Sequence, residues 1–267
     1  MEASTEFVVR ITGFATVFIV MLVWEQAVPA RQVARKWSAR STGNMLLMGI
    51  NTALLRLLMP LSLVGIAIAV EQANFGVLHR LSIPMWIRVA GTVIVLDLAV
   101  YAQHFAMHKV PVLWRMHLVH HADLEFDVTT GVRFHTLEIL VSAMYKAAIV
   151  ALLGLPAVGV LVFEVLLNAT SMFTHGNVRL PSRAERVVRA CFVTPDMHRV
   201  HHSTVPEETN SNFGFNVSWW DRLFRTYRDQ PILGHAEMRI GLSDDRDERQ
   251  VARLTGMLLL PLTASRK

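Results

Sequence analysis

The chain has 267 residues, of which 52% are hydrophobic, and its mean hydropathy is +0.37. These values are high for a soluble domain and indicate a membrane protein. The net charge of +5 does not indicate nucleic-acid binding, because the Lys and Arg residues flank apolar segments, where they set topology and contact anionic lipid. Cys191 is the only cysteine, which excludes an intramolecular disulfide, a C-x-x-C redox pair and a thiolate-bound iron–sulfur cluster supplied by this chain alone.

Three apolar segments come first along the chain, at residues 7–28, 45–70 and 84–106. Each is close to the roughly 20 residues that a helix needs to cross a bilayer. The N-terminal residues lack a basic region and a convincing small-residue cleavage site, so we expect the first segment to be a retained anchor rather than a signal peptide. The sequence thus predicts three membrane helices in its first 106 residues.

Basic residues between the first two segments set the expected orientation; they are Arg31, Arg35, Lys36 and Arg40. By the positive-inside rule this loop is cytoplasmic. The N-terminus and the loop at residues 71–83 then lie outside, and the third segment ends at the cytoplasmic face.

A second apolar block, residues 139–173, is interrupted by Gly154 and Pro156 and predicts a helical hairpin. Whether this hairpin crosses the bilayer or only dips into it, both of its ends lie on one side. His135 and His175, just outside those ends, are therefore expected at the cytoplasmic face.

The more polar residues 178–267 are expected to form a cap, in which the apolar segment 251–262 either lies on the bilayer or closes the cap. We predict a single domain over residues 1–267. Its predicted fold class is an all-α integral membrane protein with about four to five membrane helices, including the hairpin, and a cytoplasmic histidine-rich helical cap.

Eight histidines occupy three short windows, one H-x-x-x-H and two H-x-x-H-H: His104, His108, His117, His120, His121, His198, His201 and His202. Residues three and four apart share a helix face, so each window is expected to direct its imidazoles into one volume. Neutral imidazole binds first-row metals, and this number exceeds what one tetrahedral ion can use, so the windows predict two metals. A nitrogen-rich shell without thiolate suits iron, with open positions for O₂.

Ionisable residues also fall inside the apolar blocks, where such groups are costly. We interpret Arg56 and Lys146 as side chains that reach the interface. Asp97 and Tyr101 differ, because they share one helical stripe with His104 and His108. They are expected beneath that histidine pair, where they could orient imidazole N–H groups.

Six motifs, in matching order over about residues 90–230, resemble the fatty acid hydroxylase/sterol desaturase superfamily of integral-membrane di-iron enzymes. They are DLAVYAQHFAMH, PVLWRMHLVHHAD, DVTTGVRFHTLE, FTHGNV, TPDMHRVHHS and NFGFNVSWWDRLFRTY. The resemblance implies an O₂-dependent oxidoreductase that uses two iron ions at the cytoplasmic membrane face to hydroxylate or desaturate a C–H bond of a lipid. It also implies a bacterial-type member, and hence an inner-membrane location, with the eight clustered histidines and His175 as metal ligands.

The match departs from some relatives, which carry a further histidine where this chain has Ser171. His135 could take that place as a ligand or lie just outside the ligands, and a purely structural alternative is that Glu138 holds it. Glu138 is itself a possible ligand or a partner of one. Asp196 and Asp221 could be ligands or imidazole partners, although Asp196 is also placed to cap a helix.

Other polar residues carry weaker expectations. Asn177 is expected to form hydrogen bonds near the metals, on the family pattern alone. His79 and His235 are interpreted as ordinary solvated histidines, and Trp114, Trp219 and Trp220 as interfacial aromatics.

Two other classes of function stay open at this point. A zinc-dependent membrane hydrolase lacks support because no H-E-x-x-H occurs and no glutamate lies inside a histidine window. A non-enzymatic haem-binding or metal-transport protein would need single histidines on facing helices or ligands along a mid-membrane path.

The chain has no G-x-G-x-x-G, C-x-x-C or H-P-G-G motif, so electrons are expected from a separate ferredoxin, cytochrome or reductase. A sterol, fatty acyl chain, ether lipid or carotenoid is compatible as the substrate.

Overall fold

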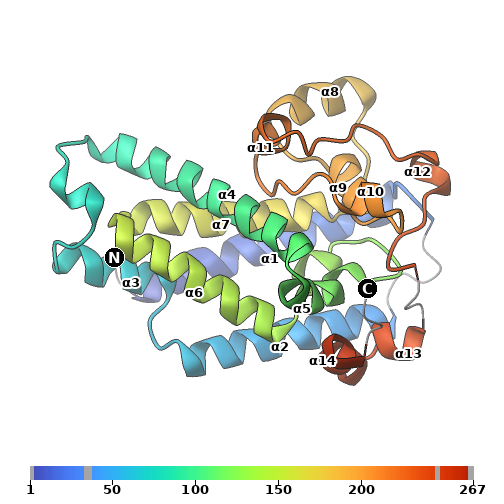
Figure 1. Ribbon diagram of the computed structural model, residues 1–267, viewed down its shortest axis with the longest axis horizontal. Coiled ribbons are helices and arrows are strands. Elements are labelled where there is room, and N and C mark those ends of the chain that lie inside the picture. Colours follow the sequence, from blue (N-terminus) through green and yellow to red (C-terminus); the bar gives the residue numbers. More distant parts are fainter. Residues whose placement is uncertain (1–2, 33–37, 244–246, 264–267) are drawn as a thin grey trace.

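The computed structural model describes residues 3–32, 38–243 and 247–263, and this part of the chain is helical. It contains no strand, only isolated β-bridges that pair Phe192 with Val217 and Ser203 with Ile240. The long helices run side by side along the long axis of the molecule, and the short helices gather at one end of them (Figure 1). The predicted all-α class is confirmed.

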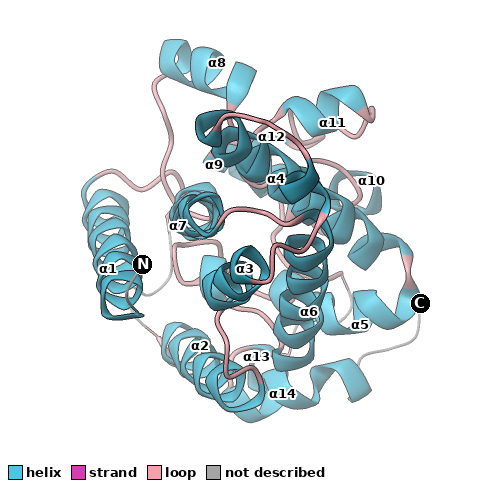
Figure 2. Cartoon of the chain, turned by 90° about the vertical axis from the view of Figure 1, so that its left-hand side faces the viewer, coloured by secondary structure: helices cyan, strands magenta, loops and turns pink. Residues whose placement is uncertain are grey.

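Five segments of the described residues are long and apolar enough to cross a membrane. They contain six helices: α1 (Ala3–Ala27), α2 (Ala39–Leu58), α3 (Leu63–Gln72), α4 (Met85–Lys109), α6 (Thr136–Leu153) and α7 (Ala157–Thr174). Viewed along the long axis, α3 lies among α1, α2, α6 and α7 (Figure 2). The close approach of α4 and α7 depends on Gly159, since a Cβ at this position would lie 2.8 Å from the Thr92 Cβ.

The second apolar segment is not one helix, so the expectation of a continuous span over residues 45–70 was wrong. Pro60 lacks an N–H and its ring prevents the preceding residue from staying helical, and α2 accordingly ends at Leu58. A new helix, α3, starts after Ser62, whose hydroxyl accepts a hydrogen bond from the Gly65 N–H at 3.0 Å. Pro60 therefore divides this apolar segment into two helices.

The predicted hairpin consists of α6 and α7, joined at Gly154, which has a left-handed φ of 69°. Its tip lies against the turn before the short 3-10 helix η1 (Val77–Arg80), where a Cβ on Gly76 would come within 2.4 Å of the Gly154 nitrogen. This turn follows α3, at the end of the bundle opposite the histidines (Figure 1). The hairpin therefore runs the length of the bundle and returns.

The basic loop and the histidine windows lie at the same end of the bundle, as expected. Arg40, at the start of α2, forms ion pairs with Asp123, at 2.7 Å, and with Asp127, both in the loop that follows His121. Arg35 and Lys36 lie outside the described residues.

Within the described part of the chain, nine short helices form the cap. They are α5 (Pro111–His121), η2 (Thr130–Val132), α8 (Ser182–Cys191), α9 (Pro195–His201), α10 (Pro206–Thr209), α11 (Trp219–Leu223), α12 (Gly234–Glu237), α13 (Glu248–Val251) and α14 (Leu254–Thr263), with η2 in the connection to α6. The apolar segment 251–262 closes the cap: Leu260 packs with Leu47 of α2 and Leu118 of α5. The Arg115 guanidinium donates to the Pro261 carbonyl at 2.8 Å.

Candidate metal centre

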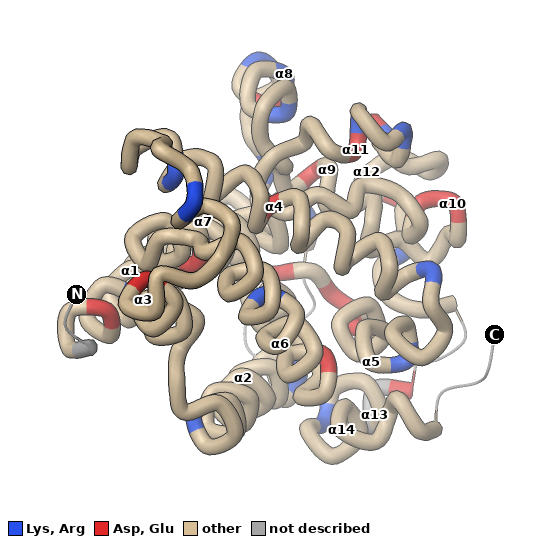
Figure 3. Tube along the Cα trace, turned by 60° about the vertical axis from the view of Figure 1, so that its left-hand side comes forward, with Lys and Arg blue, Asp and Glu red and all other residues tan. Residues whose placement is uncertain are grey.

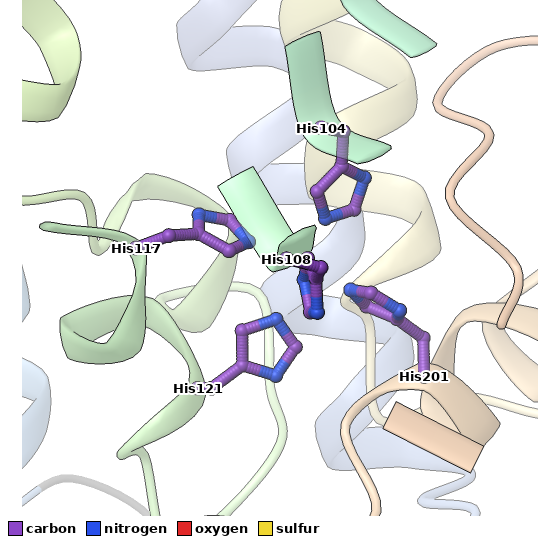
Figure 4. Close-up of side chains that lie close together, drawn as sticks. All are labelled: His104, His108, His117, His121 and His201. Atoms are coloured by element: carbon purple, nitrogen blue, oxygen red, sulfur yellow. The ribbon is translucent and has the colours of Figure 1, made fainter. Parts of the chain in front are cut away.

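Nine imidazoles converge at the cap end of the bundle in two groups. The first group contains His104, His108, His117, His121 and His201, and the second contains His120, His175, His198 and His202. Within each group the potential ligand nitrogens all lie within 4.8 Å of one another. The rings of the first group, from α4, α5 and α9, point toward a common centre (Figure 4). These are the nine histidines expected as ligands.

Each H-x-x-H-H window contributes to both groups, which corrects the expectation that each window serves one volume. His117 and His121 are one turn apart on α5 and enter the first group, whereas His120, rotated about 100° from His121, enters the second. In the same way His198 and His202 enter the second group and His201 the first. Two adjacent histidines thus allow one helix to contribute ligands to both groups.

Backbone and carboxylate acceptors fix three rings of the first group. Nδ1 of His104 lies 2.8 Å from the Phe213 carbonyl oxygen, and Nδ1 of His201 lies 2.7 Å from that of Ser211. Nδ1 of His117 lies 2.7 Å from Oε1 of Glu138. Because these oxygens accept, Nδ1 carries the proton and Nε2 keeps its lone pair. All three Nε2 atoms are buried and have no hydrogen-bond partner within the described chain.

The second group is held in the same manner. Nδ1 of His120 donates to the Arg133 carbonyl at 3.1 Å, and Nδ1 of His175 to the Ser171 carbonyl at 2.7 Å. Nε2 of His175 then lies 3.0 Å from Nε2 of both His120 and His198. For His120 and His175 this places two lone pairs face to face. Such an arrangement is what a shared cation would require, so the donor set fits a first-row metal ion.

Burial keeps six of these rings neutral, which is the form that binds metal. Desolvation, reinforced by neighbouring imidazoles, lowers the pKa values of several rings far below the usual value: His120, His121, His198 and His202. Burial lowers the pKa of His175 to about 4 and that of His201 to about 3.

A buried ionic network supports the loop between α5 and α6. Arg133 is fully buried and donates to the carbonyls of Val119, at 2.7 Å, and Val251, at 2.5 Å, and to Oδ1 of Asn44 at 3.0 Å. Burial alone would raise the pKa of Asp123, but Arg40 and Arg133 bring it below its usual value. Since Arg133 also presents its carbonyl to His120, this network positions the second group. This network was not expected, because the only sign of it in the sequence is Arg133 within the motif DVTTGVRFHTLE.

His135 lies outside both groups. It caps the start of α6: Nδ1 accepts a hydrogen bond from the Leu137 N–H at 3.2 Å, and Nε2 lies 3.3 Å from the Leu258 carbonyl oxygen. Both ring nitrogens are therefore occupied. The alternative in which Glu138 holds His135 also differs from the structure, since Glu138 binds His117.

Asp97 and Tyr101 lie on the expected face of α4, but their hydrogen bonds go to the cap rather than to imidazoles. Asp97 accepts from Nε1 of Trp220 at 2.8 Å, and the Tyr101 hydroxyl lies 2.8 Å from Oγ1 of Thr226. They fasten α11 and the segment after it to α4.

The remaining acidic candidates have structural partners. Thr194, not Asp196, caps α9, because its hydroxyl accepts from the Met197 N–H. Asp196 pairs with Arg199 at 2.5 Å. Asp221 accepts from the N–H groups of Phe213 and Gly214, at 2.7 and 2.9 Å, and so shapes the loop beside His104.

The other side chains singled out in the sequence are more buried than expected or differently engaged. The Asn177 amide exchanges hydrogen bonds with the Arg31 backbone, at 3.0 and 2.8 Å. His235 is buried rather than solvated, with Nε2 3.9 Å from Asp196. Trp114 is partly buried, with its ring centroid 4.9 Å from that of His108.

The part of the chain that carries the nine histidines is similar in sequence to known proteins. The model of the family described as fatty acid hydroxylase matches residues 89–226, which is more than half of the chain and includes all nine histidines.

Three relatives have names that state an activity. Ornithine lipid hydroxylase OlsE of Rhizobium tropici is 30% identical over 148 residues, covering 55% of this chain and 44% of that protein. Alkylglycerol monooxygenase of Caenorhabditis elegans is 26% identical over 149 residues, covering 52% and 27%. Cholesterol 25-hydroxylase of Rattus norvegicus is 28% identical over 137 residues, covering 51% and 45%. The aligned part is less than half of each relative. No solved structure matches the chain.

Proposed function

The chain belongs to the fatty acid hydroxylase family, and from that premise we propose that it is a membrane-embedded, O₂-dependent lipid hydroxylase. In this proposal the two histidine groups each hold one iron ion. All three relatives above are named as hydroxylases or monooxygenases, which favours hydroxylation over desaturation.

The observation that carries the proposal is the separation of nine buried imidazoles into two adjacent groups. One tetrahedral zinc ion would need four ligands at most, and a haem would need two axial ones. Five and four nitrogens match two cations that lie close together. The zinc-hydrolase and metal-carrier alternatives are therefore not favoured.

Iron in this environment would supply the redox chemistry by which O₂ oxidises an unactivated C–H bond. The chain itself provides binding, orientation and exclusion of water. Glu138 and the carbonyls of Arg133, Ser171, Ser211 and Phe213 fix the rings. The buried Phe213 and Phe126 rings cover the two groups, with ring centroids 5.1 Å from His108 and 5.1 Å from His202. Such a dry shell protects a reactive oxidant from side reactions.

The proposed substrate is a lipid, because the site lies at the end of apolar helices and the relatives act on an ornithine lipid, an alkylglycerol and cholesterol by their names. The proposed electron source is a separate ferredoxin, cytochrome or reductase. We place the site at the cytoplasmic face of a bacterial inner membrane, on the strength of the basic loop that shares its end of the bundle.

Metal analysis of the purified full-length protein tests the site. Two irons per chain are expected, with O₂ uptake that depends on a reductant and a lipid. His120→Ala should reduce both, while His79→Ala, which changes a histidine at the opposite end of the bundle, should preserve both.

Comparative lipidomics of cells with and without the gene tests the reaction, and a lipid that gains one oxygen is the expected product. Protein that contains zinc alone and cleaves an amide or ester would contradict the proposal. A lipid that loses two hydrogens would instead identify a desaturase.

A further inference from the structure

Helix α8 is amphipathic, but its apolar side does not face the protein. Ser182, Glu185, Arg186 and Arg189 recur at helical spacing on one side, and Ala184, Val187, Val188 and Cys191 on the other. In a soluble protein the apolar side of such a helix packs on the core.

Here the middle of the polar side of α8, at Glu185 and Arg189, faces the chain. Arg189 is buried and pairs with Glu185, at 2.5 Å, and with Asp229, at 2.7 Å. The same side lines a polar groove of about 590 Å³. The apolar side is left outward, with Val187 73% exposed and Cys191 exposed.

The outward apolar surface continues onto α11. The Ser218 N–H donates to the Cys191 carbonyl at 3.1 Å, and Phe192 pairs with Val217, so the end of α8 and the start of α11 are joined. We call the exposed side chains of the two helices the apolar ridge: Val187, Phe192, Trp219, Leu223 and Phe224. Figures 1 and 2 both show α8 at the periphery of the molecule.

The ridge lies beside a membrane helix rather than beyond its end. Trp220, within α11, donates to Asp97, which is about three turns before the end of α4 at Lys109. The Phe224 ring stacks on Tyr101 of α4, with centroids 5.3 Å apart. Since α4 is long and apolar enough to span a membrane, α11 lies at the level where its cap end enters the lipid.

Cationic side chains flank the ridge. Arg183 and Arg186 on α8, and Arg222 and Arg225 in and after α11, are all exposed. Figure 3 shows Lys and Arg on both helices. An apolar strip bordered by arginines matches the interface of a bilayer that carries anionic headgroups, where each basic residue adds to binding.

We propose that α8 and α11 form a lipid-surface element, in which the apolar ridge enters the headgroup region and the flanking arginines bind anionic lipid. The side chains of the apolar ridge hold no metal in the proposed function, and the depth of the element in a bilayer is measured without enzyme activity, so its failure and that of the proposed function are distinguishable.

Cys191, the only cysteine, permits a direct test, because it lies on the apolar side of α8. The full-length protein is spin-labelled at Cys191 and reconstituted into bilayers of phosphatidylcholine, alone or mixed with phosphatidylglycerol. The accessibility of the label to O₂, which partitions into lipid, is compared with its accessibility to a water-soluble nickel chelate.

Two reference sites calibrate the measurement in a Cys191→Ser background. Met144→Cys, 57% exposed in the middle of α6, gives the value for lipid, and Glu207→Cys, exposed on α10, gives the value for water. The Cys191 label should shift from the water reference toward the lipid reference, and further when phosphatidylglycerol is present. Arg183→Gln with Arg186→Gln should abolish the second shift. Arg80→Gln with Arg253→Gln, which removes two exposed charges elsewhere, should retain it.

A Cys191 label as accessible to nickel as the Glu207→Cys label in both bilayers would overturn the proposal and leave the ridge free for a protein partner. A label in lipid whose depth does not respond to phosphatidylglycerol, or to the loss of Arg183 and Arg186, would overturn the role of the arginines.

Discussion

The two histidine groups share α5 and α9 but differ in their third element and in enclosure. The first group stands on the end of membrane helix α4 and includes His108, which is only half-buried. The second group uses His175 at the end of α7, and all four of its rings are buried. The first group has five nitrogen donors and the second has four.

This difference predicts that the two groups tolerate the loss of a ligand to different degrees. A site with five donors keeps four when one ligand is lost, whereas a site with four donors keeps only three. We propose that a substrate approaches from the side of the first group, where His108 is the least buried of the nine histidines. The second group is the one whose His120 is bound by the carbonyl of the buried Arg133.

The strongest test of this asymmetry removes one ligand from each group. His198→Ala leaves three donors in the second group, so we expect loss of one of two metals and an activity decrease of roughly a hundredfold or more, beyond the effect of losing a supporting residue. His108→Ala leaves four donors in the first group, so both metals should stay bound. Metal content and O₂ uptake measure the result, with His79→Ala as the control. Equal metal loss in both variants would refute the asymmetry.

Acid should destabilise the metal-free protein through both groups. The folded-state pKa values of His175 and His201 are about 4 and about 3, below the ordinary 6.5, so the unfolded chain binds more protons as the pH falls below 6.5. Each such histidine lowers the free energy of unfolding by about 1.4 kcal/mol per pH unit in its window. Their stabilising contributions are complete above pH 6.5 and are lost toward pH 4 and pH 3.

Denaturation of the metal-free protein across this range measures the effect. His175→Ala and His201→Ala should each reduce the pH dependence between 6.5 and 4, and below pH 4 only His201→Ala should still do so. A pH dependence unchanged by either substitution would show that these rings are protonated in the folded state.

Glu138→Gln should weaken metal binding in the first group alone. Gln keeps the shape of the side chain but removes the charge that faces Nδ1 of His117, and loss of such a partner lowers metal affinity about 10- to 100-fold. Competition with a chelator measures the affinity of each ion. Glu207→Gln, on the exposed surface of α10, is the matched control. An equal loss of affinity for both ions would mean that the two groups are not separable.

Tyr101→Phe should have the smallest effect. It removes the hydroxyl that joins α4 to Thr226, at a cost of about 1 kcal/mol in unfolding free energy, with both metals retained. Tyr145→Phe, in α6, is the control, since its hydroxyl forms no hydrogen bond within the described chain. Thermal denaturation compares the two. A Tyr101→Phe variant as stable as Tyr145→Phe would show that this link does not hold the first group in place.

The sequence predicted the long helices and the shared end of the basic loop and histidines because these follow from local quantities: apolar run length, charge between runs and residue spacing. It missed the break at Pro60 because the hydrophobic run on both sides outweighed one proline. It allowed Glu138 as a partner of a ligand but placed it beside His135, one turn away in the chain, whereas Glu138 binds His117 across the interface of α5 and α6.

By itself, then, the sequence determined which residues could bind metal and at which end of the bundle they would meet, since helical periodicity and hydrophobicity act along the chain. Only the tertiary structure decided how nine rings divide into five and four. That division depends on which faces of α4, α5, α7 and α9 meet, and on carbonyls of Phe213, Ser211, Arg133 and Ser171 whose positions no side-chain pattern encodes.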